Sequence, residues 1–163
     1  MKTLEVPYFK QDTPYDCGPT ALQMVLAYHG MHDSEKHLAR LLHTNSTVGT
    51  RRQEMYELAV ELGFHCYVNN EANFHEIRFL LDLGVPPIVR FVEPDGEEDH
   101  YGVVVGSTEH ALTLHDPWNG PEILYTEADF VGRWTCDVLG ECDQWLMAVS
   151  QEPLPLGHQF HPE

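Results

Sequence analysis

Basic residues are scarce in this sequence: 9 Lys and Arg side chains stand against 26 Asp and Glu side chains, and the formal net charge is −17. A field of that sign repels nucleic-acid phosphates and anionic membrane surfaces, so we expect neither as a partner. Long apolar runs are also lacking. No stretch is long enough to span a bilayer, and residues 1–7 contain no apolar segment of signal-peptide length. We therefore expect no membrane insertion and a cytoplasmic location.

Cysteines are few as well, and no two of them form a C-x-x-C pair; the four are Cys17, Cys66, Cys136 and Cys142. In a cytoplasmic protein such residues are expected to be reduced thiols. Structural zinc sites use closely spaced ligand pairs, and the irregular spacing here argues against one. A metal site built from Cys66, Cys136, Cys142 and histidines stays open as an alternative. Otherwise we expect neither a metal nor a cofactor.

The length and composition predict a packed domain. A chain of 163 residues that is 42% hydrophobic, with 3 Trp, 7 Tyr and 7 Phe, can bury about two-thirds of its unfolded surface. The pattern predicts helices near residues 17–29, 34–43, 50–62, 73–83 and 126–134, and strands near 4–9, 64–68, 86–92, 100–106, 111–115, 122–125 and 144–149. Most helices precede most strands, which indicates an α+β fold with segregated layers. We assign residues 1–150 to one domain and 151–163 to a loosely held C-terminal tail.

One cysteine lies where a polar loop turns into an apolar helix. Asp16 is a suitable N-cap, Pro19 fits the first helical turn, and Gly30 is a natural stop. At the start of a helix the Cys17 thiol feels the positive end of the helix dipole, which favours the nucleophilic thiolate. The alternative is that Cys17 is an ordinary small buried side chain.

A reactive thiol needs a base, and the base needs a partner that orients it. His100 opens an apolar strand, and Asp116 ends the strand that follows. If these strands pair as an antiparallel hairpin, His100 and Asp116 become neighbours, and Asp116 could accept the Nδ1–H of the imidazole. Gln11 lies upstream of Cys17 on the same loop. Each of the three also has an ordinary interpretation, as a loop-boundary histidine, an Asp-Pro turn and a loop glutamine.

These residues together resemble a known family. The segment from Gln11 through Asp16-Cys17-Gly18-Pro19-Thr20-Ala21-Leu22, the segment His100-Tyr101-x-Val103-Val104 and the pair Asp116-Pro117 resemble the C39 family of papain-like cysteine peptidases, which includes the bacteriocin-processing peptidases. The resemblance implies a papain-like fold over about residues 4–150, with N-terminal helices packed against an antiparallel sheet. It also implies Cys17 as nucleophile, His100 as general base and acid, Asp116 as orienting residue, and Gln11 as oxyanion donor beside the Cys17 N–H. The sequence contains no membrane-spanning segment and no G-x-x-x-x-G-K motif, so we expect a stand-alone member.

The resulting expectation is a cysteine peptidase that cleaves a peptide or protein substrate through an acyl-enzyme on Cys17. An acyltransferase remains an alternative, because it shares the acyl-enzyme and differs only in the group that replaces water. A non-catalytic peptide-binding module is a second alternative. The presence of Gln11, Cys17, His100 and Asp116 together argues against it, since a binding cleft does not need all four. The oligomeric state stays open.

Overall fold

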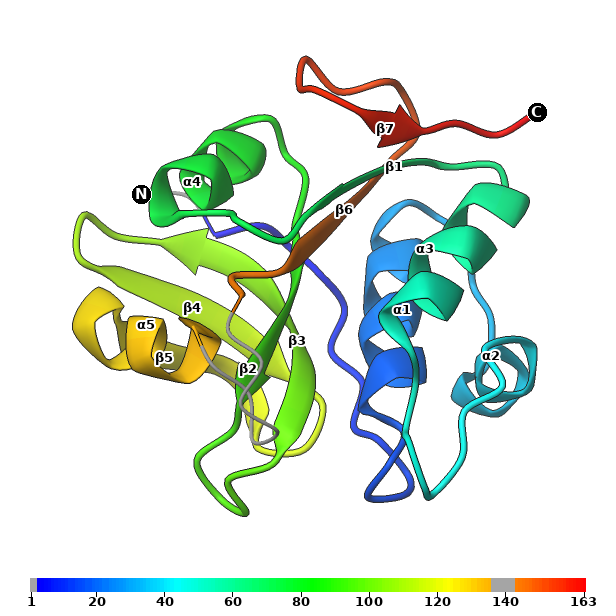
Figure 1. Cartoon of the computed structure of the whole chain (residues 1–163), viewed down its shortest axis with the longest axis horizontal. Helices are drawn as coiled ribbons and strands as arrows, with labels where there is room; N and C mark the ends of the chain where they lie inside the picture. Colours follow the sequence, from blue (N-terminus) through cyan, green and yellow to red (C-terminus); the bar gives the residue numbers. More distant parts are fainter. Residues whose placement is uncertain (1–2, 136–142) are drawn as a thin grey trace.

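A seven-stranded antiparallel sheet forms the centre of the computed structural model, which describes residues 3–135 and 143–163 (Figure 1). The strand order is β5-β4-β3-β2-β6-β1-β7. The helices are α1 (Cys17–Tyr28), α2 (Glu35–Leu41), α3 (Arg52–Glu61), α4 (Phe74–Asp82) and α5 (Glu127–Thr135). The strands are β1 (His65–Asn69), β2 (Ile88–Val92), β3 (Asp99–Ser107), β4 (Ala111–Asp116), β5 (Gly120–Thr126), β6 (Leu146–Ser150) and β7 (Gln159–Phe160).

The helices cover the sheet from two sides. In Figure 1, α1, α2 and α3 lie together on one side of the sheet, and α4 and α5 lie on the other. α1 packs mainly on β3, while α5 packs on β2 and the β4–β5 hairpin. The sheet and the N-terminal helices therefore form the α+β arrangement that the sequence predicts. Within the described part of the chain, no helix combines the length and apolar character needed to cross a membrane.

Helix α1 is almost wholly buried, which explains its apolar sequence. Leu22, Met24 and Leu26 are fully buried on the helix, and Val103 and Val104 are fully buried on β3. Burying side chains of this size contributes about 1.5–3 kcal/mol each to folding. This packing fixes the start of α1, and with it Cys17, against the middle of the sheet.

The predicted helix boundaries are confirmed to within a few residues, but the caps differ. Ser34 and Asn73 cap α2 and α4 by accepting the N–H groups of the third helical residues, His37 and Glu76. At α3 the N-cap residue is Arg51, one position after the predicted helix start at residue 50, and its side chain makes no capping hydrogen bond. Asp16 does hold the N-cap position of α1, but its side chain makes no capping hydrogen bond.

Two predictions about the ends of the chain are wrong. Residues 4–9 form no strand: Leu4 donates to the Val105 carbonyl at 2.7 Å, but Val6 donates back to Leu4, so no ladder continues. The tail after residue 150 is not loosely held, because β7 pairs with β1. Gln159 fixes the returning segment, since its amide accepts the Leu154 N–H and donates to the Leu154 carbonyl. The division at residue 150 into domain and tail stays a prediction.

Candidate active site

Cys17 is the first residue of α1 and lies in the wall of a pocket of about 420 Å³. His100 and Tyr101 from β3 line the same pocket, so the packing of α1 on β3 brings the thiol and the imidazole together. The loop before α3 also lines this pocket, with Val48, Gly49 and Thr50. Tyr101 donates from its hydroxyl to the Thr50 carbonyl at 2.8 Å and thereby ties that loop to the sheet.

His100 and Asp116 are neighbours, as the hairpin prediction requires. β3 and β4 pair antiparallel, and His100 Nε2 lies 2.6 Å from Asp116 Oδ1. The predicted ring atom is wrong, because Nε2 rather than Nδ1 faces the carboxylate. β4 lies beside β3 in the sheet while α1 packs on its face, so the two partners approach the ring from different directions. Nδ1 is therefore the nitrogen left for the Cys17 thiol.

The charges around the imidazole favour its protonated form. Burial of the His100 ring favours the neutral form. The charge of a Cys17 thiolate and the hydrogen bond and charge of Asp116 outweigh burial and raise the pKa of His100 to about 10. A hydrogen bond to Cys17 adds to this effect. The site can therefore hold the His100 imidazolium beside Cys17 at neutral pH.

Asp116 is fully buried and kept ionised by its neighbours. Burial alone would raise the pKa of its carboxyl group, but hydrogen bonds from His100 and Asn119 and the charge of His100 hold that pKa below its ordinary value. Oδ1 accepts the backbone N–H groups of Trp118 and Asn119 at 2.8 and 3.0 Å, and Oδ2 accepts the Asn119 side-chain amide at 2.9 Å. Sequence reasoning missed this role of Asn119, although Asp116 followed by an Asn-Gly pair is typical of such a side-chain-bonded turn.

Gln11 lies close to His100 and to the turn that follows Asp116. Its backbone N–H donates to the carbonyl of Pro117 at 3.0 Å, directly after Asp116. Its side chain is 4% exposed and lines a smaller cavity of about 160 Å³ together with His100 and Trp118. Nε2 donates one hydrogen bond, to the Thr13 carbonyl at 2.7 Å, and Oε1 has no hydrogen-bond partner among the described residues. The buried amide thus keeps unused hydrogen-bonding capacity next to the imidazole.

A buried carboxyl group that sequence reasoning missed ties the Gln11 loop to the Cys17 helix. Both oxygens of Glu35 accept the Asp12 N–H, and Thr20 Oγ1 contacts Glu35 Oε1. Thr20 Oγ1 also lies 2.8 Å from the Asp16 carbonyl. Burial raises the pKa of Glu35 to about 7, with the charge of Asp12 adding to the rise. Because a hydroxyl has one proton, a protonated Glu35 satisfies both Thr20 contacts, by donating to Thr20 while Thr20 donates to Asp16.

The other cysteines lack this setting. Cys66 is fully buried in β1, and burial strongly raises the pKa of its thiol. Cys136 and Cys142 lie outside the described residues, as does the metal site to which they would contribute. In the residues that the structure describes, no three His, Cys, Asp or Glu side chains are grouped to hold a metal ion.

The chain matches the peptidase C39 family over residues 5–141. The chain belongs to this family. A curated relative, the pediocin PA-1 transport/processing ATP-binding protein PedD of Pediococcus acidilactici, is 30% identical over 132 residues, which are 78% of this chain and 17% of that protein. This chain therefore spans about a sixth of that relative's length.

Solved C39 structures confirm the papain-like fold and the prediction of a cysteine peptidase. The peptidase domain of Streptococcus ComA, a bi-functional ABC transporter, is 25% identical with a TM-score of 0.73, and the match covers 93% of this chain and 100% of that one. A double glycine motif protease from an AMS/PCAT transporter, solved in complex with its leader peptide, has the same fold. Its TM-score is 0.70 at 17% identity, with 90% and 92% of the two chains covered. In this structure Cys17 and His100 line one pocket, Asp116 contacts the His100 ring, and Gln11 lines a second cavity with His100.

Proposed function

We propose that this C39 peptidase hydrolyses a peptide bond with Cys17 as nucleophile, His100 as general acid and base, and Asp116 as the residue that orients the imidazole. The position of His100 carries the proposal. Its ring bonds the Asp116 carboxylate with Nε2 and lines the pocket wall beside the Cys17 thiol. A nucleophile, a base and an orienting group in that sequence of contacts are what thiol catalysis requires.

Acylation begins from the thiolate–imidazolium pair. Cys17 Sγ adds to the scissile carbonyl carbon, and the carbonyl oxygen takes the negative charge. As the tetrahedral intermediate collapses, the C–N bond breaks and the His100 imidazolium gives its proton to the leaving amine. The acyl group then remains on Sγ as a thioester, and His100 is neutral.

Deacylation reverses these roles with water. Neutral His100 takes a proton from a water molecule while the water oxygen adds to the thioester carbon. Collapse of the second tetrahedral intermediate then breaks the C–S bond. The acid product leaves, and the thiolate–imidazolium pair is restored. Asp116 keeps its charge throughout and stabilises the imidazolium at the start and end of the cycle.

Gln11 is the proposed side-chain donor to the oxyanion. Its Nε2 carries two hydrogens, and the Thr13 carbonyl uses one of them. The second donor is the Cys17 backbone N–H, which belongs to the first helical N–H groups that lack intrahelical acceptors. Donors fixed in advance near a developing negative charge stabilise the transition state by about 3–4 kcal/mol each.

We propose a peptide or protein as substrate and the cytoplasm as the working compartment. The peptide substrate is supported by the structural relative that was solved with a leader peptide. The compartment is supported by the chemistry, because a nucleophilic thiolate works only while it is reduced.

Limited alkylation tests the assignment of the nucleophile. Substoichiometric iodoacetamide, followed by peptide mapping, should label Cys17 before Cys66, Cys136 and Cys142. Cys17→Ala should abolish cleavage of a peptide library while keeping the parent's circular dichroism and unfolding transition. Preferential labelling of another cysteine in the folded protein, or full peptidase activity of Cys17→Ala, would falsify the proposal.

A further inference from the structure

Positive charge is concentrated in the pocket beside Cys17. Arg51, Arg52 and Arg90 all line this pocket, and they are three of only nine Lys and Arg side chains in a chain with a net charge of −17. The only acidic residue among the pocket-lining residues is Asp99. This acidic protein thus gathers a third of its Lys and Arg side chains around its proposed nucleophile.

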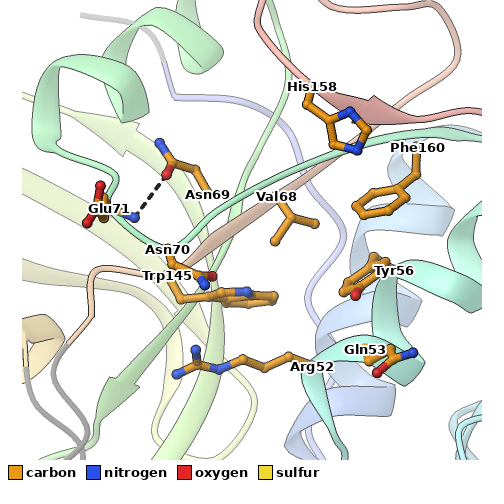
Figure 2. Close-up of a pocket in the computed structure, with 10 residues that line it drawn as sticks. All are labelled: Arg52, Gln53, Tyr56, Val68, Asn69, Asn70, Glu71, Trp145, His158 and Phe160. Carbon is orange, nitrogen blue, oxygen red and sulfur yellow. Dashed lines mark hydrogen bonds between the residues drawn. The ribbon is translucent and has the colours of Figure 1, made fainter.

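Two of these arginines are held in place by carboxylates. Arg52 makes two hydrogen bonds to Asp143, at 2.5 and 3.1 Å, and Arg90 bonds Asp99 at 3.1 Å and Asp143 at 3.4 Å. Arg52 also lies against the Trp145 ring, with its guanidinium carbon 5.4 Å from the ring centroid (Figure 2). Within the described part of the chain, Arg52 and Arg90 thus share the carboxylates of Asp99 and Asp143.

The third arginine of the pocket is Arg51. Arg51 is exposed at the N-cap of α3, and it forms no ion pair with any carboxylate in the described part of the chain. Arg90, in contrast, is only 4% exposed, and its Nε–H lacks a hydrogen-bond partner among the described residues. A buried unpaired donor and an unneutralised guanidinium in one pocket both favour an anionic ligand.

Arg52 also connects this pocket to a larger one. It lines a neighbouring pocket of about 570 Å³, which Figure 2 shows, with Tyr56 and Phe160 facing each other beyond the Trp145 indole. The two rings stack with their centroids 4.6 Å apart. A substrate peptide bound at Cys17 would therefore lie beside the arginines, with the aromatic pocket beyond Arg52.

We propose that the pocket beside Cys17 binds a carboxylate of the peptide substrate, with Arg51 as its main contact. The carboxylate belongs either to an acidic side chain close to the scissile bond or to the free chain end. The inference rests on the proposed function, because Cys17 defines where the scissile carbonyl lies.

Two alkylating agents of different charge test the local field without a known substrate. Iodoacetate carries a carboxylate and iodoacetamide does not, so the ratio of their rates at Cys17 reports the preference for an anion. We expect Arg51→Gln to lower this ratio by about threefold at low salt, and added salt to reduce the difference. Arg40→Gln is the matched control. Arg40 is also exposed, but it lies on α2 and lines a different pocket.

The control separates a local effect from a change in net charge. The inference is overturned if the ratio of the iodoacetate rate to the iodoacetamide rate is the same in the parent and in Arg51→Gln. It is also overturned if Arg51→Gln and Arg40→Gln lower that ratio equally. Peptide mapping accompanies each rate. Label on a cysteine other than Cys17 would contradict the proposed function instead, so the two failures are distinguishable.

Synthetic peptides identify the source of the carboxylate. A library is made with Glu or Gln at each position around a fixed apolar core, each peptide with a free or an amidated C-terminus. We expect the parent and Arg40→Gln to cleave the acidic members several-fold faster, and Arg51→Gln to lose that preference. Faster cleavage of the Glu peptides would identify an acidic side chain as the source of the carboxylate. Faster cleavage of the peptides with a free C-terminus would identify the chain end. Equal cleavage of all four classes by the parent overturns the inference.

Discussion

Glu35 holds the Asp12 N–H with both carboxyl oxygens, at 3.1 and 3.2 Å, and Asp12 directly follows Gln11 in the chain. One carboxyl group thus joins the loop that carries the proposed oxyanion donor to the helix that carries Cys17. Because the pKa of Glu35 is raised to about 7, the contacts between this loop and this helix depend on pH near neutrality.

Glu35→Gln should remove a pH dependence of stability. In the folded state burial raises the pKa of Glu35 to about 7, whereas the ordinary value is 4.5. The folded protein then binds the proton more tightly than the unfolded chain does. The contribution of Glu35 to the free energy of unfolding therefore falls as the pH rises from about 4.5 to about 7. Glutamine keeps both contacts, because its amide can donate to Thr20 and accept from Asp12.

Urea unfolding at pH 5 and pH 8 measures this effect. We expect Glu35→Gln to match the parent most closely at pH 5 and to gain in relative stability at pH 8. Glu61→Gln, which removes an exposed carboxylate of α3, should show no such gain. The same difference between parent and Glu35→Gln at both pH values would contradict the ionisation of Glu35 over this range.

Asp116→Asn should lower turnover by on the order of 10² or more while the protein stays folded. The amide keeps the shape of the carboxyl group but loses the charge that supports the imidazolium. The same loss should lower the pKa of His100, and the pH dependence of Cys17 alkylation by iodoacetate should shift toward lower pH. Turnover and the alkylation profile are the measurements. A variant that unfolds, with unchanged specific activity of its folded fraction, would make Asp116 a structural turn residue.

Gln11→Ala should separate catalysis from thiol activation. An oxyanion donor acts only when charge develops on the substrate oxygen, so peptide turnover should fall by about 10²–10³. Alkylation of Cys17 forms no carbonyl oxyanion and should proceed at nearly the parent rate. His100→Ala should impair both reactions. If Gln11→Ala slows alkylation as much as His100→Ala does, then Gln11 acts on the thiol or holds the loop.

Gly18→Ala should disturb the pocket wall. A Cβ at position 18 would lie 2.6 Å from Thr50 Oγ1 and 2.7 Å from Thr50 Cβ, so the loop before α3 must shift. We expect a loss of about 1–3 kcal/mol in the free energy of unfolding and a changed rate of Cys17 alkylation. Gly132→Ala is the control, because a Cβ there meets no atom within 4 Å and should stabilise α5 slightly. Equal free energies of unfolding for Gly18→Ala and the parent would contradict this prediction, because the Thr50 side chain could then move aside without destabilising the fold.

The parts of the site that were predictable from sequence depend on local patterns. Cys17 follows from a helix start, and Asp116 follows from a strand that ends in a turn. Their meeting with His100 required only that two consecutive strands form a hairpin, which β3 and β4 do. The ring nitrogen was not predictable, because it depends on the direction from which α1 packs on the sheet.

Longer-range relationships were less accessible. Glu35 looked like an ordinary residue in the first turn of α2, and its burial against Thr20 results from the packing of two helices. β7 escaped prediction because a two-residue strand carries no periodic signal, and its pairing with β1 joins segments about 90 residues apart. Arg51 was similarly unremarkable in sequence, since its importance comes from the wall of side chains around it.

Cys66 gives this enzyme a built-in probe of sheet opening. The residue lies between Val149 of β6 and Phe160 of β7, with no exposed surface, so a reagent can reach its thiol only when these strands separate. If Cys17 is first capped reversibly, the slow labelling of Cys66 measures how often that part of the sheet opens in the native protein. The two labelling rates would then report separately on the reactivity of Cys17 and on the transient opening of the sheet around Cys66.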